Sequence, residues 1–489
     1  MKTEKPLAEV LLGGAAWMMA MRWGVRLIGL ASTVILARLL MPEDFGMVAM
    51  AMVFVGLVTQ LLDFGLEFGL LRNSHAERRH YDTTWTIRLL QMAGIAVLLV
   101  LASPLIASTY DEPRVIPILW VIGLGAFVRA WENIGTIDFR KHLLFDQDFK
   151  FNIYIKLWGF LVTIGLAFYL RSYWALVLGT LFNNCVAVAL SYKMSSYRPR
   201  FSFEALHEVF GFSQWMLVRG LANYTFGRGD EFIVGKIFGS ISLGYYAVAK
   251  NISHMATAEI MSPISRAFLP GFSKFEDDPT RLASAFVRAI AGISLLVVPV
   301  GLGLSCVASE VVPLVLGEKW SQATPFLQLL PVAEVIMAIH ALAGSLVIVI
   351  GRVKMLAGVA WLRAMMMLCC VYVGYQWSGL LGVAYGMIVS SIFSFFALNS
   401  AAIHVSQVEW GNVLRALIRP LLSGLLMIAM VYEVHSVLVL PSLPLLIVKV
   451  VAGALTYLLG IFVLWRMFGG TQSIEMELMT MIRQKLKWN

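Results

Sequence analysis

Charged residues are scarce in this sequence: of its 489 residues, 14% are charged and 59% are hydrophobic. Soluble globular proteins carry roughly 25% charged and about 45–50% apolar residues. So little charge cannot cover the surface of a soluble 54.2 kDa body, which leaves a polytopic membrane protein. Since about 20 apolar residues cross the hydrocarbon, a span and its loop take roughly 35 residues, and the chain has room for about 14 spans.

Cysteine is also scarce. The four cysteines lie in apolar runs, at Cys185, Cys306, Cys369 and Cys370. No CxxC or Cys/His spacing occurs, so we predict no metal and no cofactor, and we expect the cysteines to be small buried apolar residues. The net charge of +9 is typical of the positive-inside bias of membrane proteins and does not indicate nucleic acid as a partner.

Apolar runs predict an all-α polytopic fold with about 14 transmembrane helices. We place them near 14–38, 45–70, 84–108, 114–133, 150–170, 173–193, 209–238, 243–265, 284–307, 323–350, 354–375, 380–402, 413–432 and 444–466. Most Lys and Arg residues then fall in alternate loops, and the other loops hold little beyond Arg114, Arg171, Lys236 and Lys319. This bias predicts that both termini are cytoplasmic.

The chain repeats itself at an offset of 198 residues. Trp17-Met18 coincides with Trp215-Met216, Arg38 with Lys236, and Gly46 with Gly244. Six spans per repeat is an even number, so the two lobes are parallel, an arrangement found in alternating-access transporters. We predict an N-lobe over residues 1–200, a C-lobe over 201–405, and a segment 406–489 that holds a helix pair and a cytoplasmic amphipathic tail near 473–487.

Ionisable residues inside spans are costly and therefore face a cavity or a partner. The first span carries Arg22 and Arg26, four residues apart on one helical face and without an acid in the same helix. A cationic cavity suits an anion such as phosphate, which arginine binds bidentately. The predicted substrate-binding residues are Arg26, Arg22, Arg219 and Arg228, and no catalytic residue is predicted.

The second span and the second repeat carry acids that could pair with these cations. Asp230 and Lys250 lie at equal distances from a turn near Ser240, which predicts a pair at one depth. Two interpretations stay open for these groups: a structural ion pair or an ion-responsive coupling site. The candidates are Asp63, Glu67, Asp230, Lys250 and Glu259. Weaker candidates, several of them near predicted span ends, are Arg129, Glu132, Lys156, His254, Arg288, Glu334, His340, Arg363 and Lys449.

Four stretches together carry a family resemblance: LARLLMPEDFGMVAM (36–50), LLDFGLEFGLLRNS (61–74), RAFLPGFSKFEDDPTRL (266–282) and PLVLGEKW (313–320). They resemble the polysaccharide-transporter branch of the multidrug/oligosaccharidyl-lipid/polysaccharide exporter superfamily, on the side of the Wzx-type flippases and colanic-acid exporters. The resemblance implies a flippase of the bacterial inner membrane that moves undecaprenyl-diphosphate-linked oligosaccharide between leaflets. Its implied partners are that substrate, membrane lipids, and a polymerase with export machinery.

Two other functions compete with the flippase. A cation-coupled drug antiporter of the same superfamily would be expected to present carboxylates along its path, and the first span has none. An integral membrane glycan polymerase or glycosyltransferase would need a large outer loop with catalytic groups. The longest predicted outer loop, near 309–323, offers Glu310 and Glu318 as its acids.

Overall fold

The computed structural model describes residues 7–62, 69–71, 75–206, 214–273, 275, 278–406, 408–438 and 440–468. All regular structure within these ranges is helical and no strand occurs there, which confirms the predicted all-α class. The candidates Asp63 and Glu67 and the predicted amphipathic tail lie outside the described residues.

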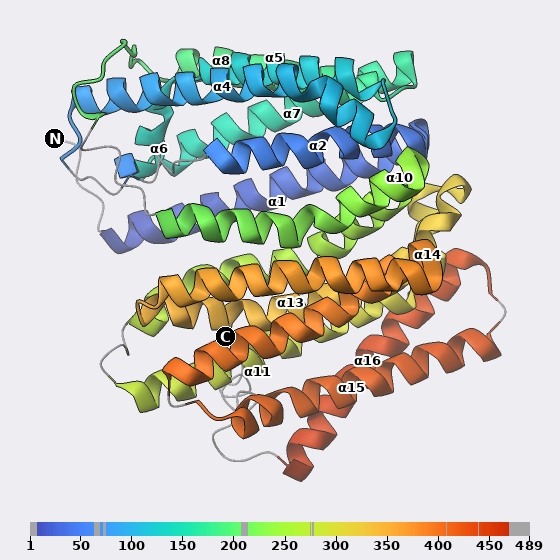
Figure 1. Ribbon diagram of the computed structural model, residues 1–489. Helices are drawn as coiled ribbons and strands as arrows, with labels where there is room; N and C mark the ends of the chain where they lie inside the picture. The colour runs from blue at the N-terminus through green and yellow to red at the C-terminus, as the bar shows by residue number, and fades with distance from the viewer. Residues whose placement is uncertain are drawn as a thin grey trace. The chain divides into compact units, whose positions relative to one another are not determined.

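The long helices follow the predicted spans closely (Figure 1). They are α1 (Leu7–Leu39), α2 (Pro42–Leu62), α4 (Arg78–Tyr110), α5 (Val115–Ala130), α7 (Phe145–Leu170), α8 (Trp174–Met194), α10 (Gln214–Ser273), α11 (Pro279–Cys306), α13 (Thr324–Val349), α14 (Val353–Val405), α15 (Trp410–Val437) and α16 (Ser442–Phe468). Short elements are η1 (Ile134–Ile137), α6 (Asp138–Lys141), α12 (Ala308–Val311), η2 (Val312–Leu316) and η3 (Glu318–Ala323). Among the described residues, 11 helices are long and apolar enough to cross a membrane, or 12 when α5 is joined to the bent segment after it.

Two of these helices each combine two predicted spans. The backbone leaves the helical region at Gly239 (φ 77°) in α10 and at Gly379 (φ 58°) in α14, and glycine tolerates positive φ without strain. The halves of α14 then lie so close that a Cβ atom at Gly382 would overlap the carbonyl oxygen of Gly374. With both helices divided, and α5 included, the described chain has fourteen long helical segments. That all of them cross the membrane stays a prediction.

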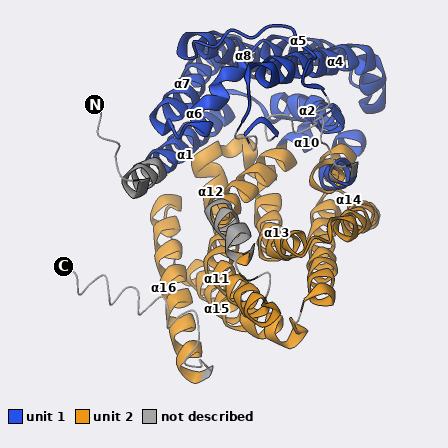
Figure 2. Cartoon of the chain, turned by 90° about the vertical axis from the view of Figure 1, so that its left-hand side faces the viewer, with its two compact units in different colours: residues 1–224, 235–244 blue, residues 225–234, 245–489 orange. Residues whose placement is uncertain are grey.

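The chain forms two compact units (Figure 2). Unit 1 holds residues 1–224 and 235–244, and unit 2 holds residues 225–234 and 245–489. In unit 1, α4 packs on α5 and α7 packs on both α1 and α8. In unit 2, α13 packs on α11 and α14, and α15 packs on α11 and α16. The predicted lobe boundaries at 200 and 405 stay predictions.

The loops of unit 1 gather in two separate sets, as alternate membrane crossings require. One set is joined by Arg114–Glu43 (2.7 Å), Lys236–Asp111 (3.1 Å), and a bond from the Tyr173 amide to Asp44 (2.7 Å). The other is joined by Tyr197 Oη donating to Asp82 (2.7 Å), Tyr81 Oη donating to Asp138 (2.6 Å), and Asn133 Nδ2 donating to the Tyr197 carbonyl (2.6 Å). The first set contains the predicted outer loops and the second contains predicted cytoplasmic ones.

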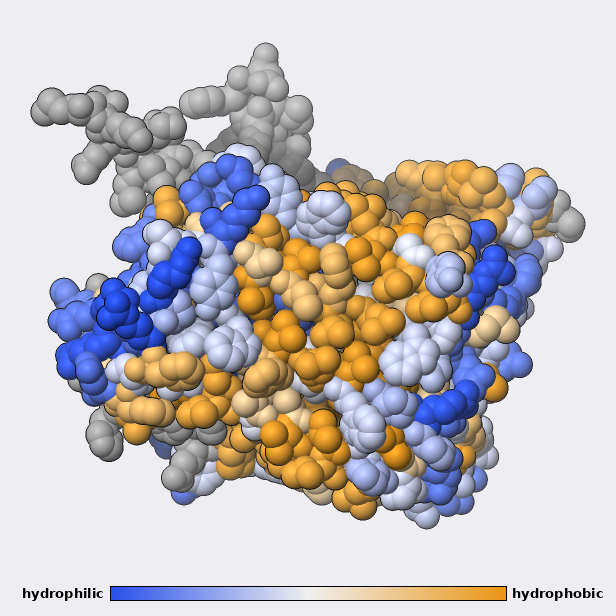
Figure 3. All heavy atoms as spheres, turned by 90° about the horizontal axis from the view of Figure 1, so that it is seen from above, coloured by the Kyte–Doolittle hydropathy of each residue, from blue (hydrophilic) through white to orange (hydrophobic). Residues whose placement is uncertain are grey.

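Surface hydropathy agrees with a membrane location. On the face shown in Figure 3, hydrophobic side chains occupy the middle and hydrophilic ones gather at opposite ends. The prediction of four buried cysteines is wrong: Cys185 and Cys369 are exposed at the protein surface. In a membrane-spanning helix an apolar side chain gains nothing by leaving the lipid for the protein interior, so hydrophobicity does not predict burial there.

Candidate functional site

A buried ionic cluster of unit 2 forms where α10 folds back on itself. The break at Gly239 reverses the chain, so that Asp230 and Lys250 face each other across the two halves of the helix. Lys250 Nζ donates to both carboxylate oxygens of Asp230, at 2.7 Å each, and to the Gly227 carbonyl at 2.7 Å. Tyr246 Oη donates to Asp230 Oδ2 at 2.6 Å. Asp230, which is fully buried, thereby accepts three hydrogen bonds.

The same cluster contains a second carboxylate. Arg228 Nη1 donates to both oxygens of Glu231, at 2.8 and 2.6 Å, and Lys250 Nζ lies 3.2 Å from Glu231. Two cations therefore neutralise two buried carboxylates. Because removal of one partner would strand a buried charge, this geometry favours a structural role for Asp230 and Lys250.

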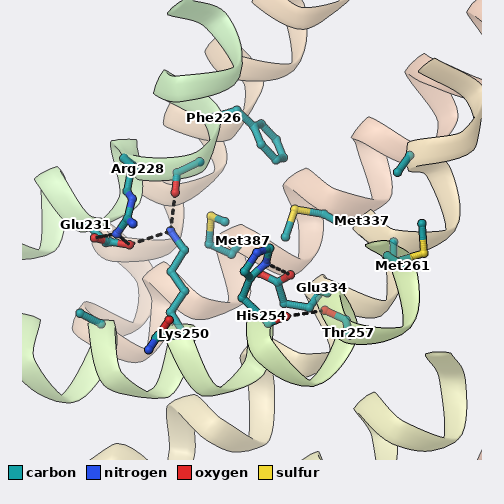
Figure 4. Close-up of a pocket in the computed structure, with 16 residues that line it drawn as sticks. Phe226, Arg228, Glu231, Lys250, His254, Thr257, Met261, Glu334, Met337 and Met387 are labelled. Carbon is teal, nitrogen blue, oxygen red and sulfur yellow. Dashed lines mark hydrogen bonds and ion pairs between the residues drawn. The ribbon is translucent and has the colours of Figure 1, made fainter. Parts of the chain in front are cut away.

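A cavity of about 490 Å³ opens beside the cluster, entirely within unit 2 (Figure 4). Its wall is largely apolar and includes Phe226, Met261, Met337 and Met387. On another part of the wall, His254 Nδ1 of α10 lies 3.0 Å from Glu334 Oε2 of α13. The sequence shows both residues as ionisable groups in spans, but their contact joins positions 80 residues apart and depends on how α13 packs.

Glu259 and Arg219 lie elsewhere. Glu259 is half-buried on α10 and follows two residues that line the unit 2 cavity, Thr257 and Ala258, without lining it. Arg219 is half-buried on the part of α10 that belongs to unit 1. Of the four arginines predicted to contact substrate, Arg228 lines the unit 2 cavity and is paired with Glu231.

Arg22 and Arg26 are half-buried on α1, which packs against α7 in unit 1. The Trp17 and Phe149 rings lie 5.0 Å apart, and a Cβ atom added at Gly24 would overlap the Ile153 side chain. One turn further along α7 is Lys156, which interacts electrostatically with Arg26. Next to these cations is a second cavity, of about 380 Å³, formed by α1, α5, α7 and α8.

The two cavities differ in charge. The unit 2 cavity is lined by carboxylates and cations together, whereas the described lining of the unit 1 cavity includes Arg129 and Lys156 and no carboxylate. Nowhere in the described part of the chain do three or more His, Cys, Asp or Glu side chains form a group that could hold a metal ion. The side chains that line the two cavities can bind charged and polar groups.

Comparisons with known proteins agree with this description. A family model described as "Polysaccharide biosynthesis protein" matches residues 35–325. The lipopolysaccharide biosynthesis protein WzxC of Escherichia coli K12 is 25% identical over 400 residues, which cover 80% of this chain and 81% of WzxC. The succinoglycan biosynthesis transport protein ExoT of Rhizobium meliloti is 22% identical over 334 residues, 68% of this chain and 67% of ExoT.

The fold has a counterpart among solved structures. The lipid II flippase MurJ in an inward closed conformation superposes with a TM-score of 0.73, at 12% identity, over 92% of this chain and 98% of MurJ. These matches confirm the resemblance stated for the sequence and the predicted helical membrane fold. Of the proteins named here, ExoT is described as a transport protein and MurJ as a flippase.

Proposed function

This chain belongs to the polysaccharide biosynthesis protein family, and we propose that it is a flippase for undecaprenyl-diphosphate-linked oligosaccharide. It carries the lipid-linked unit from the inner to the outer leaflet of the bacterial inner membrane by alternating access, with both termini in the cytoplasm. A polymerase and export machinery would take up the unit on the outer face. The observation that carries the proposal is the similarity to WzxC over four fifths of each chain.

In this function the cations of unit 1 bind the anionic part of the substrate. Arg26 and Arg22 on α1, together with Arg219, contact the diphosphate as it passes, because guanidinium groups bind phosphate oxygens in pairs. Arg228 contributes as well, from the unit 2 cavity that it lines. Asp230 and Lys250 hold the two halves of α10 together, while Asp63, Glu67 and Glu259 are candidates for ion coupling or for further structural pairs.

The competing functions receive less support. A drug antiporter shares the superfamily, but the family match and the named relatives concern polysaccharide biosynthesis. An enzyme of the outer face would draw on the acids of the longest predicted outer loop, Glu310 and Glu318. Glu310, however, is buried and bound to Lys449 at 2.5 Å. A carboxylate held in such a pair is poorly placed to act on a glycan.

A cellular experiment separates these functions. Depletion of a flippase should leave synthesis of the lipid-linked unit intact, so the unit accumulates on the cytoplasmic leaflet while surface polysaccharide is lost. Depletion of a glycosyltransferase would instead stop the unit at a shorter saccharide. Normal surface polysaccharide after depletion, with no accumulation of the lipid-linked unit, would refute the proposed function.

A further inference from the structure

The cavity of unit 1 has an unusual lining for a membrane interior. Its polar groups include Asn152, Lys156 and Thr163 of α7 and Asn183 of α8, next to Ser32 of α1. Saccharides present hydroxyl groups that both donate and accept hydrogen bonds, and amide and hydroxyl side chains are suited to both roles. The lining therefore fits a sugar better than it fits an acyl chain.

Lys156 is the cation of this cavity that remains available to a ligand. The other lining cation, Arg129, is held by Glu132 at 2.5 Å, and Glu132 also binds Arg88 at 3.1 Å. Lys156 is half-buried near the middle of α7, and within the described residues no carboxylate or hydrogen-bond acceptor contacts its ammonium group. Its electrostatic neighbour is another cation, Arg26.

Two glycines bring polar side chains into this wall. A Cβ atom at Gly159 would overlap the Asn183 amide, and one at Gly179 would overlap the Thr163 hydroxyl. Each glycine thus lets a polar side chain of the neighbouring helix lie against its backbone. Thr163 donates to the Gly159 carbonyl at 2.7 Å, and Asn152 Nδ2 donates to the Asp148 carbonyl at 2.8 Å. These contacts hold the polar wall in place around Lys156.

We propose that Lys156, with Asn152 and Asn183 beside it, binds an anionic group on the headgroup of the transported lipid. Where that group is a sugar carboxylate, Lys156 makes the flippase selective for anionic saccharides. The inference rests on the proposed function and adds the site that binds an anionic group of the substrate. The group is a carboxylate on a sugar ring or a phosphate oxygen of the diphosphate, since one ammonium binds both. A partly buried cation that has no counterion among the described residues is stabilised by an anionic ligand.

The test uses full-length protein in lipid vesicles and two lipid-linked oligosaccharides that differ at one position. One carries a hexuronic acid, and in the other that carboxylate is reduced to a primary alcohol. Lys156→Gln should lower transport about tenfold or more, because it removes a charge-assisted hydrogen bond. Lys156→Arg should keep most of the activity. Lys150→Gln is the matched control, since Lys150 lies on the same helix but is exposed and paired with Asp146.

The outcomes distinguish the two sources of the anion. If Lys156→Gln lowers transport of the acidic substrate alone, Lys156 binds the sugar carboxylate. If it lowers transport of both substrates equally, Lys156 binds the diphosphate. Wild-type rates for both substrates in Lys156→Gln would overturn the proposal. Membrane abundance and melting temperature are measured for each variant, so that a folding defect is recognised.

A binding measurement keeps the inference separate from the proposed function. Inorganic pyrophosphate and glucuronate are titrated into the purified protein, and the change in tryptophan fluorescence is followed for wild type and for Lys156→Gln. Binding that depends on Lys156, in a protein that moves neither lipid, would refute the flippase and retain the anion site. No difference in binding of either probe would refute the anion site, whatever the transport result.

Discussion

Gly46 and Gly244 are 198 residues apart, the offset of the internal repeat, and they meet backbone to backbone. A Cβ atom at Gly46 would overlap the carbonyl oxygen of Ser240, and one at Gly244 would overlap the carbonyl oxygen of Pro42. Pro42 and Ser240 are also 198 residues apart. Each glycine therefore meets the residue that corresponds, in the other repeat, to the partner of the other glycine. Reciprocal contacts of this kind are expected where a local twofold axis relates two segments.

This contact predicts that neither glycine accepts a side chain. Gly46→Ala and Gly244→Ala should each destabilise the protein by about 1–3 kcal/mol, the usual cost of overpacking, because the obstacle is backbone and cannot rotate away. The melting temperature of the purified protein in detergent measures the effect. Gly29→Ala and Gly165→Ala are controls, since a Cβ atom at either position meets nothing within 4 Å. Equal melting temperatures for all four variants would show that the segments do not meet in this way.

The Asp230–Lys250 pair should behave as a coupled structural unit. Asp230→Ala and Lys250→Ala should each cost about 3–5 kcal/mol, because each strands a buried charge. The double variant should be less unstable than the sum of the single effects, with a coupling energy of about 1 kcal/mol or more. Thermal unfolding of the three variants, or their membrane abundance, gives the comparison.

The exposed pair Lys236–Asp111, at 3.1 Å, is the matched control for this cycle. Its side chains are 42% and 83% exposed, so alanine at either position should cost less than about 1 kcal/mol. Strict additivity at Asp230 and Lys250 would mean that the two charges do not interact.

Arg26 provides a prediction about the substrate path. It lies half-buried on α1 beside Val25, which lines the unit 1 cavity. Arg26→Ala should leave abundance in the membrane normal and reduce surface polysaccharide about tenfold or more, because a charge-assisted bond to diphosphate is lost. Arg26→Lys keeps the charge without the bidentate fork and should retain partial activity. Arg22→Ala should reduce surface polysaccharide less than Arg26→Ala does. Normal surface polysaccharide in Arg26→Ala would show that Arg26 does not lie on the substrate path.

The topology can be measured independently of transport. Reporter fusions after Lys150, Arg200 and Lys487 should report the cytoplasm, and a fusion after Asp111 should report the outside. The reason is the alternating Lys and Arg bias together with the separation of the unit 1 loops into two sets. A fusion after Arg200 that reports the outside would contradict both the repeat and the number of spans.

The sequence is informative where a contact is local or symmetric. Asp230 and Lys250 could be paired from their equal distances to one turn, and the loops could be sorted by their charge. Contacts between distant helices could not be predicted in this way. His254 meets Glu334, and Glu310 meets Lys449 across 139 positions, because helix rotation and packing select these partners. The sequence shows that each is an ionisable residue in or near a span, but it does not show which partner neutralises it.

The same distinction applies to the unit 1 cavity. Lys156 is visible in the sequence as an intramembrane cation, like Arg129, and both are plausible partners of an acid. The structure separates them, because Glu132 holds Arg129 while Lys156 lines the cavity together with polar groups of α8. The Arg129–Glu132 pair is an i,i+3 contact that the sequence spacing indicates, whereas the surroundings of Lys156 depend on how α1, α5, α7 and α8 pack around the cavity.

Translocation of a labelled lipid-linked oligosaccharide in vesicles that contain only the purified protein tests the proposed function most directly. The label is placed on the saccharide, and exposure of the saccharide on the opposite leaflet is followed with a membrane-impermeant reagent. A flippase should expose the label at a rate that rises with the amount of protein and falls in Arg26→Ala. Exposure no faster than in protein-free vesicles, by protein that retains its native melting temperature, would contradict the proposed function.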